Sequence, residues 1–456
     1  MSDAAPGRRL VWARVGLFSL VFVVHVTSPN VIVSDSRRLL AVAQSIVDRQ
    51  TISIDQLRDR VAPSDYDVVV HDGHVYPLFP WGTALFAVPA VVAYDVGDAL
   101  GWWPGTDARV AQAGSDWPSQ VFVASAVVAA TTIVIHQIAL LELAALGTRR
   151  RRRLALLGAL GFAFGTAAWS TVSRSMWQHG PSMLFLSLAA VLAVRSRTHT
   201  EAARWLGLPL AAAYVVRPTN AIPLVVFGLW MVICRRREVL WFAAGAAVVL
   251  ALFVVVNVST YGSLLPPYYA AQRLGRTPHF LEALAGNLIS PGRGLLLFSP
   301  VLGLAAVGVI LKLRAGSLDG LDVVLAGCVV GHWLAISSFP LWWGGDAFGP
   351  RFFSDMVPFL VVLSLPVLLR LGTAAPTFRR TLAAGVCSAL LAVSVAINFA
   401  GAYLPSTWCW NVLPVDFGVR PERLWSWRDP QFLRRGPVVR AGVVKHGCPA
   451  MAPSRP

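Results

Sequence analysis

Long apolar segments separated by short polar turns recur along almost the whole chain of 456 residues. A helix needs about 20 predominantly apolar residues to cross the hydrocarbon core of a bilayer, or somewhat fewer where its ends adapt. The pattern predicts an all-α polytopic membrane protein, with a bundle of about 11 transmembrane helices. We expect these helices near residues 10–27, 119–146, 154–172, 180–195, 204–217, 219–234, 238–258, 294–311, 321–340, 355–370 and 381–402.

The stretch 78–96 is also apolar, but we do not count it as a span. If it crossed the membrane, the arginine run 149–153 would lie on the outer side, against the usual bias. Its prolines Pro77, Pro80 and Pro89 suit a short broken helix. We therefore expect a re-entrant or interfacial helix at 78–96 within one first extracytoplasmic loop, residues 28–118.

Composition supports this class, because charged residues make up only 14% of the chain and the mean hydropathy is +0.61. The net charge of +16 resides largely in basic turns at 149–153, 195–204, 235–237, 312–314 and 370–380. Such turns stay cytoplasmic and contact anionic lipid, so the charge does not indicate nucleic acid as a partner. The amino terminus is then cytoplasmic. The excess of arginine over lysine, with much Ala, Val and Gly, is typical of a high-GC bacterium and predicts a multi-pass protein of its plasma (inner) membrane.

This topology divides the chain into a transmembrane module, residues 1–402, and an extracytoplasmic tail rich in Trp, Pro and Arg, residues 403–456. A second outer loop is expected at 259–293. Cys409 and Cys448 both lie in the tail, on the oxidising side, where they either form a disulfide or remain free.

Asp35 stands close after the first span, at the start of a stretch in which apolar residues recur at helical spacing as far as Arg49. An interfacial helix is expected there. Asp35 can be the N-cap of this helix, or a base that takes a proton from an acceptor hydroxyl at the outer membrane face. The two roles are compatible.

Further acidic and aromatic residues follow in the same loop. Asp65, Asp67 and Asp72 are candidates for a second acid, and His71, Asp72 and His74 have the side chains of a metal site but no metal-specific spacing. We therefore expect no cofactor, although a divalent metal remains an alternative. Aromatic rings beside polar groups suit sugar binding, and an interfacial aromatic belt is the alternative. The residues with this pattern are His74, Tyr76 and Trp81.

Arginine also occurs at outer helix ends, where the topological bias disfavours it. A charge at the bilayer centre costs roughly 2.5–3.5 kcal/mol on insertion scales. One reason for such arginines is phosphate binding, since a guanidinium binds phosphate oxygens bidentately; the alternative is snorkelling to the interface. The arginines to which this applies are Arg174, Arg217 and Arg351, whereas Arg293 lies in the second outer loop, which either lines a substrate groove or packs on its neighbours. The neighbouring candidates for substrate binding are His179, Trp343 and Asp346.

These features together resemble the GT-C superfamily of integral-membrane glycosyltransferases, and its protein mannosyltransferase-like members in particular. The resemblance rests on the cytoplasmic amino terminus, the large outer loop with its early acid Asp35, and three short segments. The segments are Tyr-Pro-Leu-Phe-Pro-Trp-Gly-Thr at 76–83, Leu-Phe-Ser-Pro at 297–300, and Trp-Trp-Gly-Gly at 342–345 followed by Phe-Gly-Pro-Arg-Phe at 348–352.

The resemblance implies a GT-C-like bundle with juxtamembrane helices and an inverting transfer of a hexose or pentose from a polyprenyl-phosphate donor. Asp35 would be the general base, and His179 would donate a hydrogen bond to a substrate. The donor phosphate would be bound, and its charge stabilised on departure, by arginine, in order of preference Arg351, Arg217, Arg174 and Arg293. The acceptor would be a hydroxyl of a cell-wall glycan, a glycolipid or a protein. Ser36 follows Asp35 where the family commonly has a second acid, so a paired-carboxylate or metal-dependent mechanism is not carried over.

Two other functions fit a chain of this class. One is a transporter or flippase of a lipid-linked sugar, although transporters often contain internal repeats and this chain shows no convincing one. The other is a noncatalytic subunit of a glycan assembly complex.

Overall fold

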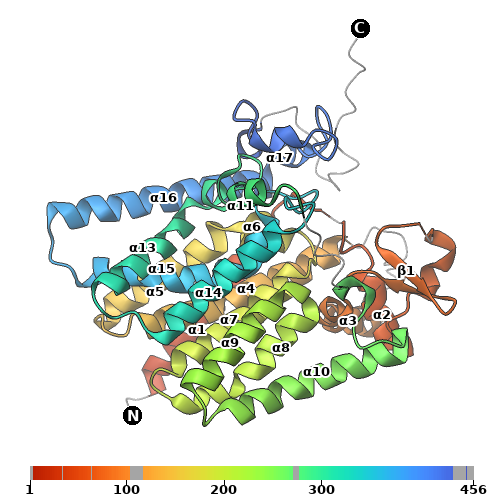
Figure 1. The fold of residues 1–456 in the computed structure, drawn as a ribbon, viewed down its shortest axis with the longest axis horizontal. Coiled ribbons are helices and arrows are strands. Elements are labelled where there is room, and N and C mark those ends of the chain that lie inside the picture. Colours follow the sequence, from red (N-terminus) through yellow and green to blue (C-terminus); the bar gives the residue numbers. More distant parts are fainter. Residues whose placement is uncertain are drawn as a thin grey trace, which may run out of the picture.

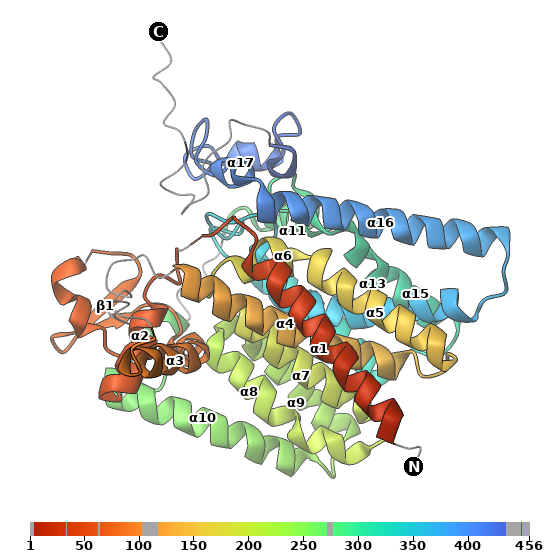
Figure 2. The same cartoon turned by 180° about the vertical axis from the view of Figure 1, so that it is seen from behind.

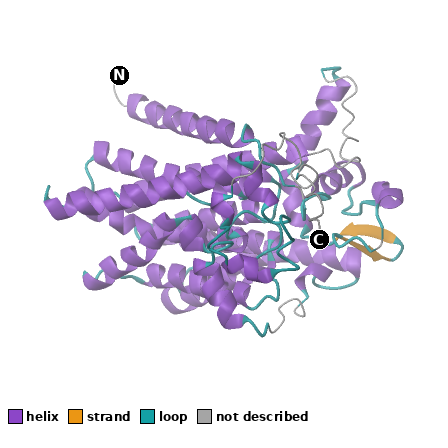
Figure 3. Ribbon diagram, turned by 90° about the horizontal axis from the view of Figure 1, so that it is seen from above, coloured by secondary structure: helices purple, strands orange, loops and turns teal. Residues whose placement is uncertain are grey.

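The computed structural model describes residues 4–32, 34–62, 64–102, 117–270, 277–434 and 448. Helices running side by side make up most of it, with the two strands at the end of the bundle opposite the amino terminus (Figure 3). The helices at the predicted spans are α1 (Ala4–Val26), α4 (Trp117–Glu142), α5 (Thr148–Phe164), α7 (His179–Arg195), α8 (Gly207–Val216), α9 (Ala221–Cys234), α10 (Val239–Tyr261), α13 (Leu304–Arg314), α14 (Gly320–Ser337), α15 (Val357–Thr373) and α16 (Phe378–Tyr403).

Five of the described helices are long and apolar enough to cross a membrane, and a sixth span results if α5 and the bent segment that follows it are counted as one. Other predicted spans form shorter α-helices, because proline or glycine lies near their ends. Thus α8 is 10 residues long and stops before Pro218, and α13 is 11 residues long and starts after Gly303. In both places a 3-10 turn adjoins the α-helix. The prediction of an all-α polytopic membrane protein is confirmed.

The first loop contains α2 (Leu39–Arg49), the antiparallel strands β1 (Val68–His71) and β2 (His74–Pro77), and α3 (Val88–Ala99), which lie together at one end of the bundle (Figures 1 and 2). The apolar stretch 78–96 is broken, as expected, into the 3-10 helix η2 (Trp81–Phe86) and α3. The helix α2 begins later than expected. Its N-cap is Arg38, so the N-cap interpretation of Asp35 is wrong.

Helix contacts in the core depend on small residues. At Gly308 of α13, an added Cβ would lie 1.9 Å from the carbonyl oxygen of Leu363 on α15, so only glycine permits this approach of the two backbones.

Helices α10 and α16 lie at two edges of the bundle (Figure 1).

Short helices lie between the longer ones: α6 (Ala167–Ser170), α11 (Phe280–Ile289), α12 (Leu295–Phe298) and, in the tail, α17 (Pro405–Cys409). The tail also contains the 3-10 helices η11 (Pro421–Trp425) and η12 (Gln431–Leu433). A disulfide joins Cys409 to Cys448, so one of the two alternatives for these cysteines is realised.

Candidate active site

Asp35 and Arg351, which are far apart in sequence, form an ion pair. Asp35 lies in the turn before α2, and Arg351 is the first residue of the 3-10 helix η10 (Arg351–Met356), which leads into α15. Arg351 Nη1 donates to Asp35 Oδ2 at 3.0 Å. The Arg351 side chain is 9% exposed and that of Asp35 is 24% exposed, so the pair is shielded but reachable. The predicted catalytic base and the preferred candidate for phosphate binding are therefore in direct contact.

Aromatic rings hold the guanidinium of Arg351 in place. Its Cζ lies 4.7 Å from the ring centroid of Trp177 and 5.5 Å from that of Phe352, distances at which cation–π attraction contributes. Asp35, Arg351 and His179 line a narrow cleft with Phe79, Pro80 and Thr83 of the first loop. Its free volume is about 10 Å³, roughly the room of one water molecule.

Behind this cleft lies a buried cluster around Asp355, a residue of η10 that the sequence analysis did not select. Arg217 Nε lies 2.6 Å from Asp355 Oδ2, and His179 Nδ1 lies 3.3 Å from the same oxygen. Arg217 Nη1 also lies 3.4 Å from His179 Nε2. Two of the predicted residues, Arg217 and His179, therefore share one carboxylate next to Arg351.

The contacts assign the tautomer of each histidine in this cluster. His179 donates from Nδ1 to the carboxylate, so its Nε2 accepts from Arg217. His332 donates from Nε2 to the carbonyl oxygen of Phe352 at 2.8 Å, and the same nitrogen lies 3.8 Å from Asp355 Oδ2. Asp355 Oδ1 is buried and accepts no hydrogen bond from any described residue.

A signal for Asp355 existed in the sequence. It is an acidic residue at the start of an apolar segment, four positions after Arg351, and intramembrane acids are commonly functional and paired. The span predicted at 355–370 begins at this residue, so the sequence places its charge at a helix end close to Arg351.

Asp65 and Asp67 bind the two arginines that follow Asp35 in the chain. The buried carboxylate of Asp67 accepts from Arg37 Nε at 2.6 Å and from Arg38 Nε at 3.0 Å. Asp65 accepts from Arg38 Nη2 at 3.2 Å. These contacts fix the turn that carries Asp35, which gives both acids a positioning role. Ser36 is also tied down, through Ser175 Oγ.

The remaining residues selected in the first loop do not line the cleft. Asp72 and His74 lie in the β1–β2 hairpin, where His74 Nδ1 lies 2.7 Å from Asp55 Oδ2 and Asp72 is exposed at the turn. Tyr76 packs against Tyr261. Trp81 donates to Asn257 Oδ1 of α10 at 3.3 Å. Tyr76 of the hairpin and Trp81 of η2 thus contact α10.

Arg174 is fully buried and binds backbone carbonyls. Its Nη1 donates to the carbonyl oxygen of Ser28 at 2.7 Å, and its Nη2 donates to that of His25. Its own carbonyl oxygen accepts from Ile32 N at 3.3 Å. Arg174 therefore holds the segment that leads from α1 to Asp35, and the structure does not bring its guanidinium into the cleft.

Arg293, which precedes α12, is buried against the tail, and its guanidinium N–H groups are all engaged. They donate to the carbonyl oxygens of Gly292, Trp343 and Gly345 and to the side chains of Asn411 and Gln431, at 2.8–3.0 Å. Burial lowers the pKa of Arg293 to about 9, so it remains charged at neutral pH. No donor is left for a phosphate. Trp343 packs on Phe417 of the tail, and the charge of the half-buried Asp346 acts on Arg293.

No group of three or more His, Cys, Asp or Glu side chains that could hold a metal ion occurs in the described part of the chain. His71 and His74 pair across the hairpin, and His74 is engaged by Asp55. The cleft itself offers one carboxylate, already paired with an arginine. Its chemistry suits an anionic ligand better than a cation.

Comparison with known proteins finds structures with a similar fold. No family model matches the sequence, and no curated protein matches it. A crystal structure of ArnT from Cupriavidus metallidurans bound to undecaprenyl phosphate matches 87% of this chain and 72% of its own, with 12% identity and a TM-score of 0.50. The apo structure of the same protein matches 88% of this chain and 76% of its own, with 15% identity and a TM-score of 0.45. The likeness to the first structure concerns the fold alone: this chain shares the fold of that ArnT structure, in agreement with the helical bundle that the sequence resemblance implied.

Proposed function

We propose that this protein is an inverting glycosyltransferase that moves a sugar from a polyprenyl-phosphate donor to a hydroxyl acceptor. The observation that carries the proposal is the contact of Asp35 with Arg351 in one cleft, because it combines a base with a phosphate-binding group. The fold supports it, since the ArnT structure that shares this fold binds undecaprenyl phosphate.

In the proposed reaction, an acceptor hydroxyl attacks the anomeric carbon of the donor sugar while the bond from that carbon to the phosphate oxygen breaks. Asp35 takes the hydroxyl proton. The lipid leaves as a phosphate monoester, which carries more negative charge than the diester did. Arg351 stabilises that charge in the transition state, because it is already in place and shielded from water.

The buried cluster would support Arg351. Arg217 would add positive charge beside the departing phosphate. The carboxylate of Asp355 holds the side chains of both Arg217 and His179 in place. Asp355 also offsets one positive charge, so the cluster is not strongly cationic before the donor binds. His179 is placed to donate a hydrogen bond once its contacts with Arg217 and Asp355 rearrange.

The cleft is too small for a sugar in the present arrangement, with about 10 Å³ free. We infer that the donor phosphate displaces the Asp35 carboxylate from Arg351. This exchange would open the cleft and release Asp35 to act as a base only when a donor is present. Hydrolysis of an idle donor would thereby be limited.

The reaction would take place on the extracytoplasmic face of a plasma (inner) membrane, with the amino terminus in the cytoplasm and the tail outside. The site lies at the end of the bundle away from α1's amino terminus, consistent with this orientation (Figure 2). A cell-wall glycan, a glycolipid or a protein would be the acceptor. The donor sugar would be a hexose or a pentose, and no cofactor is required by the mechanism.

The test is transfer of radiolabelled sugar from a panel of polyprenyl-phosphate sugars by purified protein in lipid nanodiscs. We expect Asp35→Asn and Arg351→Gln each to lower kcat by about 100-fold or more, as removal of a base or of a charge-stabilising group does. Asp72→Asn is the matched control, since it removes an exposed carboxylate from the hairpin turn, and it should retain wild-type turnover.

Equal turnover by wild type and Asp35→Asn would remove Asp35 as the base. Movement of intact donor across a vesicle membrane without transfer would contradict the enzyme and support a flippase. Donor binding without turnover, with every acceptor class present, would support a noncatalytic subunit.

A further inference from the structure

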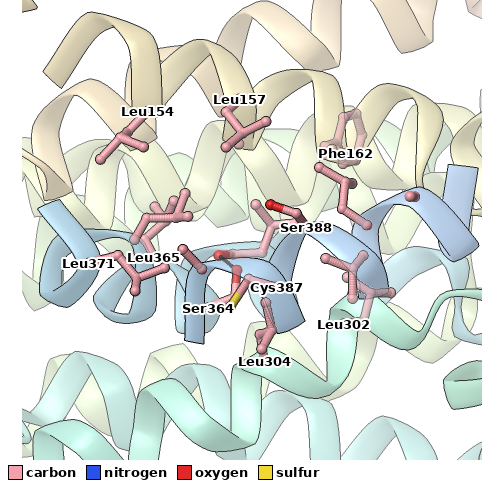
Figure 4. A pocket seen from close by; sticks show the side chains of 18 of the residues that line it. Leu154, Leu157, Phe162, Leu302, Leu304, Ser364, Leu365, Leu371, Cys387 and Ser388 are labelled. Atoms are coloured by element: carbon pink, nitrogen blue, oxygen red, sulfur yellow. Dashed lines mark hydrogen bonds between the residues drawn. The ribbon is translucent and has the colours of Figure 1, made fainter. Parts of the chain in front are cut away.

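Helix α16 leaves a large apolar groove against the rest of the bundle. Its buried residues, Ser394, Asn398, Ala400, Gly401 and Ala402, all lie in its second half. On another side of the helix, from Arg380 to Phe399, a groove of about 860 Å³ runs between α16 and helices α5, α13 and α15. Figure 4 shows side chains from these elements, including Leu157, Leu304 and Leu365, around the hollow.

In its second half, α16 is bound to its neighbours by buried hydrogen bonds. Ser394 Oγ accepts from the backbone of Val301 at 3.0 Å, and Asn398 Nδ2 donates to the carbonyl oxygen of Phe298 at 3.0 Å. Ser170 Oγ donates to Asn398 Oδ1 at 2.7 Å. This buried network joins α16 to its neighbours, and no residue that lines the groove also lines the cleft at Asp35. The groove is therefore not an extension of the cleft.

The opposite end is strongly basic. Arg150 of α5 and Arg380 of α16 line the groove there, and they donate to the carbonyl oxygens of Gly372 and Leu371 at the end of α15. Neither forms an ion pair with an acidic side chain among the described residues. The sequence contains no Asp or Glu from 143 to 168 or from 357 to 403, so no acidic residue of α5, α15 or α16 offsets this charge.

We propose that this groove binds an anionic membrane phospholipid, whose acyl chains lie along α16 and whose headgroup phosphate binds Arg150 and Arg380. The apolar lining matches the chains, and the two guanidinium groups match a phosphate, which arginine binds bidentately. From Arg380 to Phe399, the lining residues of α16 extend over about 28 Å at 1.5 Å per residue. That length is about the thickness of the hydrocarbon core, so the groove runs at the depth of lipid chains.

The lipid would come from the leaflet on the arginine side, which is the cytoplasmic one in the predicted topology. It would bridge α5 and α16 on the arginine side of the contact between Gly161 and Leu391. The site would thus be occupied independently of the polyprenyl-phosphate donor, which reacts at the other end of the bundle.

Native mass spectrometry of the full-length protein, released from nanodiscs made of equal parts phosphatidylglycerol and phosphatidylcholine, tests the proposal. We expect wild type to retain phosphatidylglycerol preferentially, and Arg150→Gln/Arg380→Gln to lose about tenfold in that preference, as loss of charge-assisted contacts predicts. The matched control is Arg149→Gln/Arg379→Gln, which removes the same charge from neighbouring positions that do not line the groove, and it should behave as wild type.

A second variant fills the groove and leaves the arginines in place. Ala384→Phe/Ser388→Phe should also lose the retained lipid, because both positions line the hollow. Equal loss in the Arg149→Gln/Arg379→Gln control, or undiminished retention in the filled variant, would overturn the proposal. Stronger retention of undecaprenyl phosphate than of phosphatidylglycerol, when both are supplied, would overturn the assignment to a phospholipid.

Discussion

The carboxylate of Asp355 is fully buried, and its partners Arg217 and His179 are buried with it. Removing one member of such a pair leaves an uncompensated charge in a medium of low dielectric constant, which typically costs about 3–5 kcal/mol. We therefore expect Asp355→Asn to lower the free energy of unfolding by a similar amount. It should also lower sugar transfer by about 100-fold or more, because Arg217 and His179 lose their fixed positions beside Arg351. Thermal unfolding in detergent and the transfer assay measure the two effects.

His332→Gln is the control for this variant. His332 lies near Asp355 but donates its hydrogen bond to the backbone of Phe352, so the Asp355–Arg217 contact should survive and activity should stay within about tenfold of wild type. If Asp355→Asn were as active as wild type, the positions of Arg217 and His179 beside Arg351 would not matter for sugar transfer.

The arginines show what sequence can and cannot predict at the residue scale. Arg217, Arg351, Arg174 and Arg293 were all selected as arginines on the outer side, where positive charge is unexpected. The structure brings the first two next to Asp35 or His179, but it uses the other two to bind backbone carbonyls and the tail. A guanidinium that organises loops and one that awaits a ligand give the same sequence signal, because both are charges that need anionic or carbonyl oxygens. Only the three-dimensional partners distinguish them.

Among the elements, the β1–β2 hairpin depends on a single carboxylate. Asp55 accepts hydrogen bonds from the backbone N–H of Val75 at 2.9 Å, from His74 Nδ1 at 2.7 Å and from Arg58 Nη2 at 3.0 Å. Burial raises the pKa of Asp55, but these hydrogen bonds outweigh it and lower the pKa to about 2. The charged form is thus favoured in the folded hairpin. The resulting stability is fully present above the unfolded pKa of about 3.9 and is lost as the pH falls through about 2.

Asp55→Asn should therefore weaken the hairpin by about 1–2 kcal/mol at pH 4 and above, and by little at pH 2. Pepsin, which is active at both values, provides the measurement. Cleavage within residues 50–80 should be faster in the variant than in wild type at pH 4, and the two rates should converge at pH 2. A difference that persists at pH 2 would show that Asp55 acts through packing rather than charge.

The contact between helices α13 and α15 requires glycine at one position. Gly308→Ala would place a Cβ against the Leu363 backbone, which cannot move without separating the helices, so we expect a loss of about 2 kcal/mol or more in stability. Gly385→Ala is the matched control in α16, since nothing lies within 4 Å of its added Cβ. It should be neutral or slightly stabilising, because alanine has the higher helix propensity. Equal melting temperatures of the two variants would contradict the close approach.

For the whole molecule, the hydrophobic pattern was enough to predict most helices, because a bilayer requires an apolar segment to satisfy its own backbone hydrogen bonds. The broken stretch 78–96 could also be predicted, since Pro77, Pro80 and Pro89 preclude a continuous helix. The start of α2 was missed because Arg37 and Arg38 are drawn into contacts with Asp67, which lies about 30 positions later in the chain. Long-range pairing of this kind, like that of Asp35 with Arg351, leaves no local periodicity to detect.

The orientation of the molecule in the membrane is a prediction that its cysteines can test. The disulfide between Cys409 and Cys448 belongs to the tail, whereas the exposed Cys234 ends α9 beside the basic turn 235–237. With the tail outside, where disulfides persist, a membrane-impermeant maleimide applied to intact cells should label Cys409 and Cys448 only after treatment with an impermeant phosphine. Cys234 should be labelled only after lysis, and Cys234→Ser should remove just that signal. Labelling of Cys234 in intact cells would show that the basic turns lie outside the cell. The end of the bundle that contains Asp35 and Arg351 would then face the cytoplasm, and the predicted orientation would be wrong.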